Sequence, residues 1–158
     1  MNTSSEPFLL SNAHTFVGRE MALTDWVFVD QIQANVFGEV TRWTPWMHSD
    51  PKRCEEESPY GGTIMHGFMM VSLLTHFLDI ANLRPTDAGH SLNYGMDKVR
   101  VLRPVVIGDG VQLRDRITLL DVTDKGEGRR LFKTGHSIEV KDSDKPAVYV
   151  EYLNYWYP

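Results

Sequence analysis

The segment from Thr63 to Asn82, TIMHGFMMVSLLTHFLDIAN, constrains the fold of this chain more than any other. Its apolar side chains occupy most of a helical circumference, which predicts a helix of about nineteen residues, about 28 Å long, buried on nearly all sides. Histidine, serine and aspartate side chains interrupt the apolar run and exclude a membrane span. A single buried helix needs a surrounding layer, which the rest of the chain has to supply.

Segments with strand character follow this helix. From Leu92 onward, the segment NYGMDKVRVLRPV (residues 93–105) leads into an alternating segment at 111–119. The turns TDKGEG and KDSDKP separate this segment from RRLFKTGHSIEV and PAVYVEYLNYWY. Consecutive strands with short turns predict an antiparallel meander. We therefore predict an α+β architecture, the hotdog fold, in which an antiparallel sheet wraps around a long buried helix. An uncovered sheet edge in so small a domain also predicts a homodimer or a higher homo-oligomer.

The N-terminal part of the chain has a different character. Residues 1–15 are polar and predict a flexible tail, while residues 16–158 are of a length typical of one domain. Asp30 is placed to cap a helix in which Ile32 and Val36 share one face.

Charge and composition limit the class of partner. The chain carries 16 basic and 21 acidic residues, a net charge of -5, so we expect no nucleic-acid partner. A single cysteine, Cys54, fits a reducing compartment, and the N-terminus lacks the features of a signal peptide. We expect a cytoplasmic protein without membrane attachment. No histidine pair has the spacing of a zinc site, so we expect no metal and no other cofactor.

A long irregular connection before the helix is the natural place for a functional site. Gly61 and Gly62 precede the predicted helix, and backbone N–H groups near Gly62, Thr63 and His66 are predicted to form an oxyanion hole for a substrate carbonyl. The His66 side chain is interpreted as a residue that fixes the loop through a hydrogen bond.

Several motifs together resemble one family. FGEVTRWTPWMHSDP, SPYGGTIMHGFMMVSLL and NYGMDKVRVLRPVVIGD are similar to the MaoC-like hydratase family, in the branch named for nodulation protein N, and the likeness covers residues 17 to 157. The resemblance implies a dimeric hotdog domain that acts on an acyl thioester of coenzyme A or of an acyl-carrier protein. Members that hydrate trans-2-enoyl thioesters, or dehydrate 3-hydroxyacyl thioesters, use an aspartate and a histidine five residues later. The histidine matches His48, but the aspartate position holds Trp43.

This replacement removes a group that hydration needs. Water must be activated at the β carbon and a proton delivered to the α carbon, while the carbonyl oxygen takes up negative charge. His48 is predicted to be the remaining proton-transfer group, with Trp43 and Trp46 as walls of the substrate pocket. The sequence predicts a lyase-like enzyme of a biosynthetic pathway with altered chemistry: elimination, isomerisation or cyclisation.

Alternatives remain open at this level. Glu39, Asp50 and Asp97 are candidates to replace the missing acid, although Asp50 is more simply a helix cap. A hotdog thioesterase would place an acid near the start of the helix, whereas Asp79 lies far along it. A non-catalytic acyl-binding protein is the third class. Three basic residues of one strand are interpreted as a solvated face or as ligands of coenzyme A phosphates: Lys98, Arg100 and Arg103.

Overall fold

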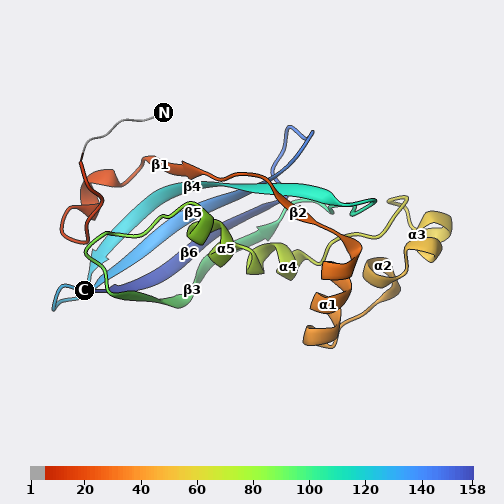
Figure 1. Cartoon of the computed structure of the whole chain (residues 1–158), viewed down its shortest axis with the longest axis horizontal. Helices are drawn as coiled ribbons and strands as arrows, with labels where there is room; N and C mark the ends of the chain where they lie inside the picture. Colours follow the sequence, from red (N-terminus) through yellow and green to blue (C-terminus); the bar gives the residue numbers. More distant parts are fainter. Residues whose placement is uncertain (1–5) are drawn as a thin grey trace.

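The computed structural model describes residues 6–158, which form one antiparallel sheet and several short helices. The elements in chain order are η1 (Ala13–Phe16), β1 (Glu20–Leu23), β2 (Val27–Val29), α1 (Gln31–Thr41), α2 (Trp46–Ser49), α3 (Pro51–Glu57), α4 (Gly67–Ser72), α5 (Leu74–Ile80), β3 (His90–Val101), β4 (Val111–Asp124), β5 (Arg130–Val140) and β6 (Val148–Tyr157). The strand order is β1-β4-β5-β6-β3, and β2 also pairs with β4. Figure 1 shows α4 and α5 running along one face of the curved sheet, and the helices α1 to α3 beyond one end of it. The predicted α+β hotdog architecture is confirmed.

The sheet has the predicted meander at its centre. β4 pairs with β5 and β5 with β6, in both cases antiparallel over nearly their full lengths. β3 pairs with β6 on one side only, so it is an edge strand. Among residues 6–158, the other edge of β3 has no hydrogen-bonded neighbour, so this edge is available to pair with a strand of a second copy.

The central helix is shorter than predicted and is interrupted at Leu73. It begins at Gly67, because residues 63–65 pair with residues 105–107 in an extended conformation. The Met65 N–H donates to the Val105 carbonyl at 2.8 Å, and the Ile107 N–H donates to the Thr63 carbonyl at 2.9 Å. The prediction of one helix over the whole segment is therefore wrong at its start, since sheet-like hydrogen bonds replace helical ones there.

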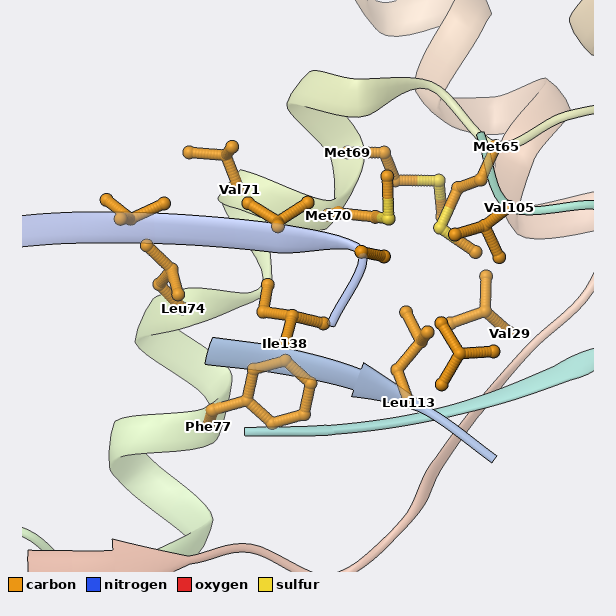
Figure 2. Packing of buried hydrophobic residues seen from close by; sticks show 14 of the residues in the cluster. Val29, Met65, Met69, Met70, Val71, Leu74, Phe77, Val105, Leu113 and Ile138 are labelled. Atoms are coloured by element: carbon orange, nitrogen blue, oxygen red, sulfur yellow. The ribbon is translucent and has the colours of Figure 1, made fainter. Parts of the chain in front are cut away.

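One face of the helix is also uncovered in the single chain. Phe68 is 77% exposed and Ile80 is 43% exposed. The opposite face packs into the core: Figure 2 shows Met69, Met70, Val71, Leu74 and Phe77 against side chains from the strands. The prediction of burial on nearly all sides is met for one side of the helix only.

The N-terminal segment contributes a second, smaller core. Leu10, Ala13 and Phe16 are buried against Leu119 and Phe132. Residues 6–15 of the segment predicted to be a flexible tail are therefore packed on the sheet, and residues 1–5 lie outside the described residues. None of the helices in residues 6–158 is long and apolar enough to cross a membrane.

Candidate active site

A cavity of about 450 Å³ lies where the end of α1, the following loop and the start of α4 meet. Its lining is mostly apolar and consists of Phe37, Thr41, Trp43, His48, His66, Gly67 and Phe68. The structure thus brings together three of the predicted site residues, Trp43, His48 and His66. They come from segments about twenty residues apart in the sequence.

Local sequence sets the course of the loop that carries His48. Asp30 caps α1 by accepting the Gln33 N–H at 3.0 Å, as predicted, and Arg42 ends the helix in the left-handed region with φ of 58°. The Trp43 N–H then donates to the Gly38 carbonyl at 2.9 Å. A side chain at Gly38 would place its Cβ 3.0 Å from the Trp43 carbonyl oxygen, so glycine permits this close approach.

The His48 ring has a defined tautomer. Its Nδ1 lies 2.6 Å from the Ile64 carbonyl oxygen. Because a carbonyl only accepts, Nδ1 carries the proton and the neutral ring keeps its lone pair on Nε2. Nε2 has no hydrogen-bond partner within residues 6–158. His48 can therefore accept a proton from a molecule in the cavity.

Gln31 braces the backbone of His48 and was missed by the sequence reasoning. Its Nε2 donates to the His48 carbonyl at 2.6 Å, and its Oε1 accepts the hydroxyl of Thr63. Thr63 is buried and acts here through its side chain. A glutamine in the first turn of a surface helix carries no sequence signal of such a role.

His66 stacks on His48, and its surroundings favour the neutral form of its ring. The two ring centroids are 4.0 Å apart, and the His66 Nε2 donates to the Trp43 carbonyl at 3.2 Å. Burial lowers the pKa of His66, the nearby His48 lowers it further, and the hydrogen bond to Trp43 opposes both. Its Nδ1 is buried without a partner among the described residues, which suits a lone pair and not a proton. The hydrogen bond from His66 to Trp43 is a contact of the kind that the sequence interpretation expects for a residue that fixes the loop.

Free backbone donors lie at the start of α4. The N–H groups of His66, Gly67 and Phe68 find no acceptor within residues 6–158, as is usual for the first turn of a helix. All three residues line the cavity. A side chain at Gly67 would place its Cβ 2.9 Å from Val101 Cγ2, so the close approach to β3 requires glycine. These donors can hydrogen-bond an oxyanion beside His48.

Trp43 covers one side of the cavity. Its side chain is 64% exposed, yet it lines the same cavity as the His48 ring. The indole thus lies beside the imidazole and not on a separate surface.

Comparison with known proteins gives the family. Residues 12–139 match the family described as MaoC like domain. Nodulation protein N of Rhizobium leguminosarum is 32% identical over 146 residues, which cover 91% of this chain and 88% of that protein. The 3-hydroxyacyl-thioester dehydratase Z of Mycobacterium tuberculosis is 35% identical over 134 residues, which cover 85% of this chain and 86% of the relative.

The chain belongs to the MaoC-like dehydratase family.

Solved structures agree on the fold of this MaoC-like chain. A monoamine oxidase regulatory protein from Archaeoglobus superposes with a TM-score of 0.78 and 16% identity, covering 95% of this chain and 94% of the other. The (R)-hydratase of Pseudomonas aeruginosa superposes with a TM-score of 0.66 and 20% identity, covering 87% of this chain and 79% of the other.

Other predicted site residues of the MaoC-like chain lie elsewhere. Trp46 stacks under the Arg53 guanidinium at 4.4 Å and does not line the cavity. Gly61 and Gly62 are also outside it, and the Gly61 N–H donates to the Ser58 carbonyl at 3.2 Å. Of the three predicted oxyanion donors, Gly62 and Thr63 lie outside the cavity, whereas His66 lines it together with Gly67 and Phe68. The glycine next to His66 was the signal that could have located them.

The described lining of the cavity contains no carboxylate. Asp50 caps α3 by accepting the Arg53 N–H at 3.0 Å, as its alternative interpretation predicts, and Asp97 pairs with Lys133 at 2.6 Å. Glu39 is exposed on α1. None of these three acids reaches the ring of His48 in place of the missing aspartate.

The basic residues of β3 are engaged away from the cavity. Lys98 lies 3.7 Å from Glu151, and Arg100 donates to the Val99 carbonyl at 2.7 Å. Arg103, just after the strand, donates to the Ser143 hydroxyl at 2.8 Å. Within residues 6–158, no three His, Cys, Asp or Glu side chains are grouped so that they could hold a metal ion.

Proposed function

We propose that this protein acts on an acyl thioester through an enolate, with His48 as the proton-transfer group. The observation that carries the proposal is the free Nε2 of His48 beside the unpaired N–H groups of the α4 turn, in one cavity. A thioester carbonyl at these N–H groups becomes more acidic at its α carbon, since the donors stabilise the enolate oxygen. His48 then takes the α proton at Nε2.

The described lining of the His48 cavity contains no carboxylate, and this limits the reactions that we propose for the site. Addition of water needs a group that holds and activates the water; by the family resemblance Trp43 stands at the sequence position of that group, and its side chain lines the cavity. Elimination of a leaving group, double-bond migration and cyclisation each need the enolate and one proton shuttle. We therefore infer altered chemistry of this kind, on a substrate linked to coenzyme A or to a carrier protein.

The relatives support the substrate class. One of them is named as a 3-hydroxyacyl-thioester dehydratase and is alignable over most of both chains. The mostly apolar cavity suits the hydrocarbon part of an acyl group. A thioesterase is not supported by the position of Asp79, which lies exposed near the end of α5.

Turnover of a small panel tests the proposal. We expect little hydration of crotonyl-CoA, no release of free thiol, and conversion of 3-enoyl thioesters, or of thioesters whose β substituent leaves without acid help, that His48→Ala abolishes. Glu39→Gln is the matched control, because Glu39 lies outside the cavity. Equal rates for His48→Ala and the wild type remove His48 from the mechanism. Binding of acyl thioesters without any turnover supports the second candidate, an acyl-binding protein, which the replacement at Trp43 favours.

We also infer that two copies assemble through β3. The strand has an unpaired edge and exposes Leu92, Tyr94 and Met96, while Phe68 of α4 is exposed on the neighbouring helix. Pairing of two β3 edges extends the sheet and covers these side chains. Sedimentation at micromolar concentration is expected to give twice the chain mass of 18.1 kDa. A monomer that turns over substrate contradicts this inference.

A further inference from the structure

The apolar part of the His48 cavity is made of aromatic rings. Phe37, Trp43 and Phe68 carry the large apolar side chains of its lining, and no leucine, isoleucine, valine or methionine is among the described lining residues. The other members are two histidines, a glycine and Thr41. The apolar surface that a ligand meets in this cavity is therefore almost entirely that of rings.

These rings leave space between them. Within residues 6–158, the Trp43 and Phe68 rings pack against no other aromatic ring, and the Phe37 ring has only His66 as a ring neighbour, at 5.3 Å between centroids. The exposed fractions of Trp43 and Phe68 are 64% and 77%. Aromatic side chains prefer the edge or the offset face of another ring. Two rings without such a neighbour, at one cavity, can accept a ring from a ligand.

The polar groups of the lining are already assigned. The Thr41 hydroxyl donates to the Phe37 carbonyl at 2.8 Å, and the His66 Nε2 donates to the Trp43 carbonyl at 3.2 Å. The Nε2 of His48 and the N–H groups of the α4 turn are the groups that the proposed function uses for the α proton and the carbonyl oxygen. The part of the ligand that lies between the rings is therefore expected to be apolar.

The volume of the cavity places the ring close to the thioester. An apolar cavity of about 150 Å³ can hold benzene, and the His48 cavity measures about 450 Å³. A phenyl ring therefore needs about a third of this volume, and the remainder accommodates the carbonyl and a few carbons. His48 and Gly67, which face the reacting carbons, belong to the same lining as the three rings. A short spacer between the ring and the carbonyl is sufficient.

We propose that the acyl group of the substrate carries an aromatic ring a few carbons from the thioester carbonyl, bound by Phe37, Trp43 and Phe68. This inference rests on the proposed function, because it places the carbonyl at the α4 turn and the α carbon beside His48. It also assigns a role to the indole of Trp43. The side chain at the sequence position of the aspartate then supplies a wall for the ring of the substrate.

Saturated thioesters with equal numbers of carbons test the ring independently of turnover. Calorimetric titration is done with 3-phenylpropanoyl-CoA, 3-cyclohexylpropanoyl-CoA and nonanoyl-CoA. Burial of apolar area alone predicts that the cyclohexyl compound binds at least as tightly as the phenyl compound, because its apolar surface is larger. Aromatic pairs add attraction beyond the buried area. We therefore expect the phenyl compound to bind about 5- to 50-fold more tightly than the other two.

Variants at position 43 locate the preference. Trp43→Leu removes one of the rings and is expected to lower the ratio of phenyl to cyclohexyl affinity by about 2- to 10-fold. Trp43→Phe keeps an aromatic ring and is expected to retain most of the ratio. Trp26→Leu is the control at a tryptophan outside the cavity, which lies against the Arg114 guanidinium at 4.4 Å, and it is expected to leave the ratio unchanged.

The adenine of coenzyme A is a second aromatic group that could meet Trp43, and all three thioesters contain it. If Trp43→Leu weakens the three thioesters equally and the wild type shows no preference among them, the indole binds adenine and the proposal is overturned.

The remaining outcomes separate this inference from the proposed function. Equal or tighter binding of the cyclohexyl compound to the wild type overturns the aromatic site and leaves the His48 chemistry standing. Binding of none of the three thioesters overturns both. If a variant fails to fold, the comparison of ligands on the wild type still decides.

Discussion

Replacing Trp43 with aspartate is expected to create hydratase activity. The backbone of Trp43 makes the contacts that hold the loop, since its N–H donates to Gly38 and its carbonyl accepts from His66. These contacts do not depend on the side chain. The variant therefore places a carboxylate at the edge of the cavity of His48, where the hydrating relatives of the family are expected to have one.

Two effects of Trp43→Asp can be estimated, the loss of unfolding free energy and the gain in hydration rate. The Trp43 side chain is 64% exposed, so about a third of it is buried. An aromatic side chain of about 150–250 Å² then loses about 50–90 Å² of burial, worth about 1–2 kcal/mol of unfolding free energy. A positioned acid or base adds about 10²- to 10⁴-fold to a rate. We expect Trp43→Asp to hydrate crotonyl-CoA at least about 10²-fold faster than the wild type.

The assay follows the loss of enoyl thioester absorbance when crotonyl-CoA is hydrated. Trp43→Asn is the matched control, because it has the size of aspartate without its basicity. Thermal unfolding shows whether both variants are folded. The reasoning is refuted if folded Trp43→Asp is no faster than Trp43→Asn. It is also refuted if the wild type already hydrates crotonyl-CoA at an ordinary enzyme rate, about 1 to 10³ per second.

Three further predictions concern the supports of the site. Gly67→Ala places a Cβ 2.9 Å from Val101 Cγ2 and crowds the free N–H groups, so kcat is expected to fall about 10²-fold, measured with whichever thioester is turned over. Gln31→Leu removes the hydrogen bond to the His48 carbonyl and is expected to lower the unfolding free energy, measured by urea titration, by about 1–2 kcal/mol. The variant is also expected to have a lower kcat, and an unchanged kcat would contradict the role of Gln31 in holding the His48 backbone. The pKa of His66 is lowered in the folded protein, so its contribution to stability is complete above about pH 6.5 and is lost as the pH falls below that value. As the pH falls from 6.5 to 5, the unfolding free energy of His66→Gln is therefore expected to decrease less than that of the wild type. An equal decrease in both proteins would contradict a lowered pKa of His66 in the folded protein.

The fold could be predicted because its pattern is carried by long segments. Alternation along β4, β5 and β6 and the turns between them defined the meander without further information. The start of the helix was misjudged for a physical reason: Thr63 and Met65 bond to a segment forty residues away, and local periodicity contains no trace of that contact. The packing of Leu10 and Phe16 was likewise hidden in a segment of polar composition.

The site could be predicted in part. The family resemblance directed attention to Trp43 and His48, which line one cavity together with His66, whereas Gly67, which lines the same cavity, was not singled out. Two of the three predicted donors, Gly62 and Thr63, precede the helix by several residues, because the position of the free N–H groups depends on where the helix begins. Gln31 could not be found, since its role rests on contacts to His48 and Thr63 that only the folded chain creates.

Exchange of the α hydrogen tests the central claim most directly. A saturated acyl-CoA is incubated with the protein in D₂O, and deuterium at the α carbon is followed by NMR. Formation of an enolate at the α4 turn with His48 as the base predicts exchange with the wild type and with Glu39→Gln, and none above background with His48→Gln. Exchange at the wild-type rate in folded His48→Gln would contradict the account, since the proton would then leave through another group.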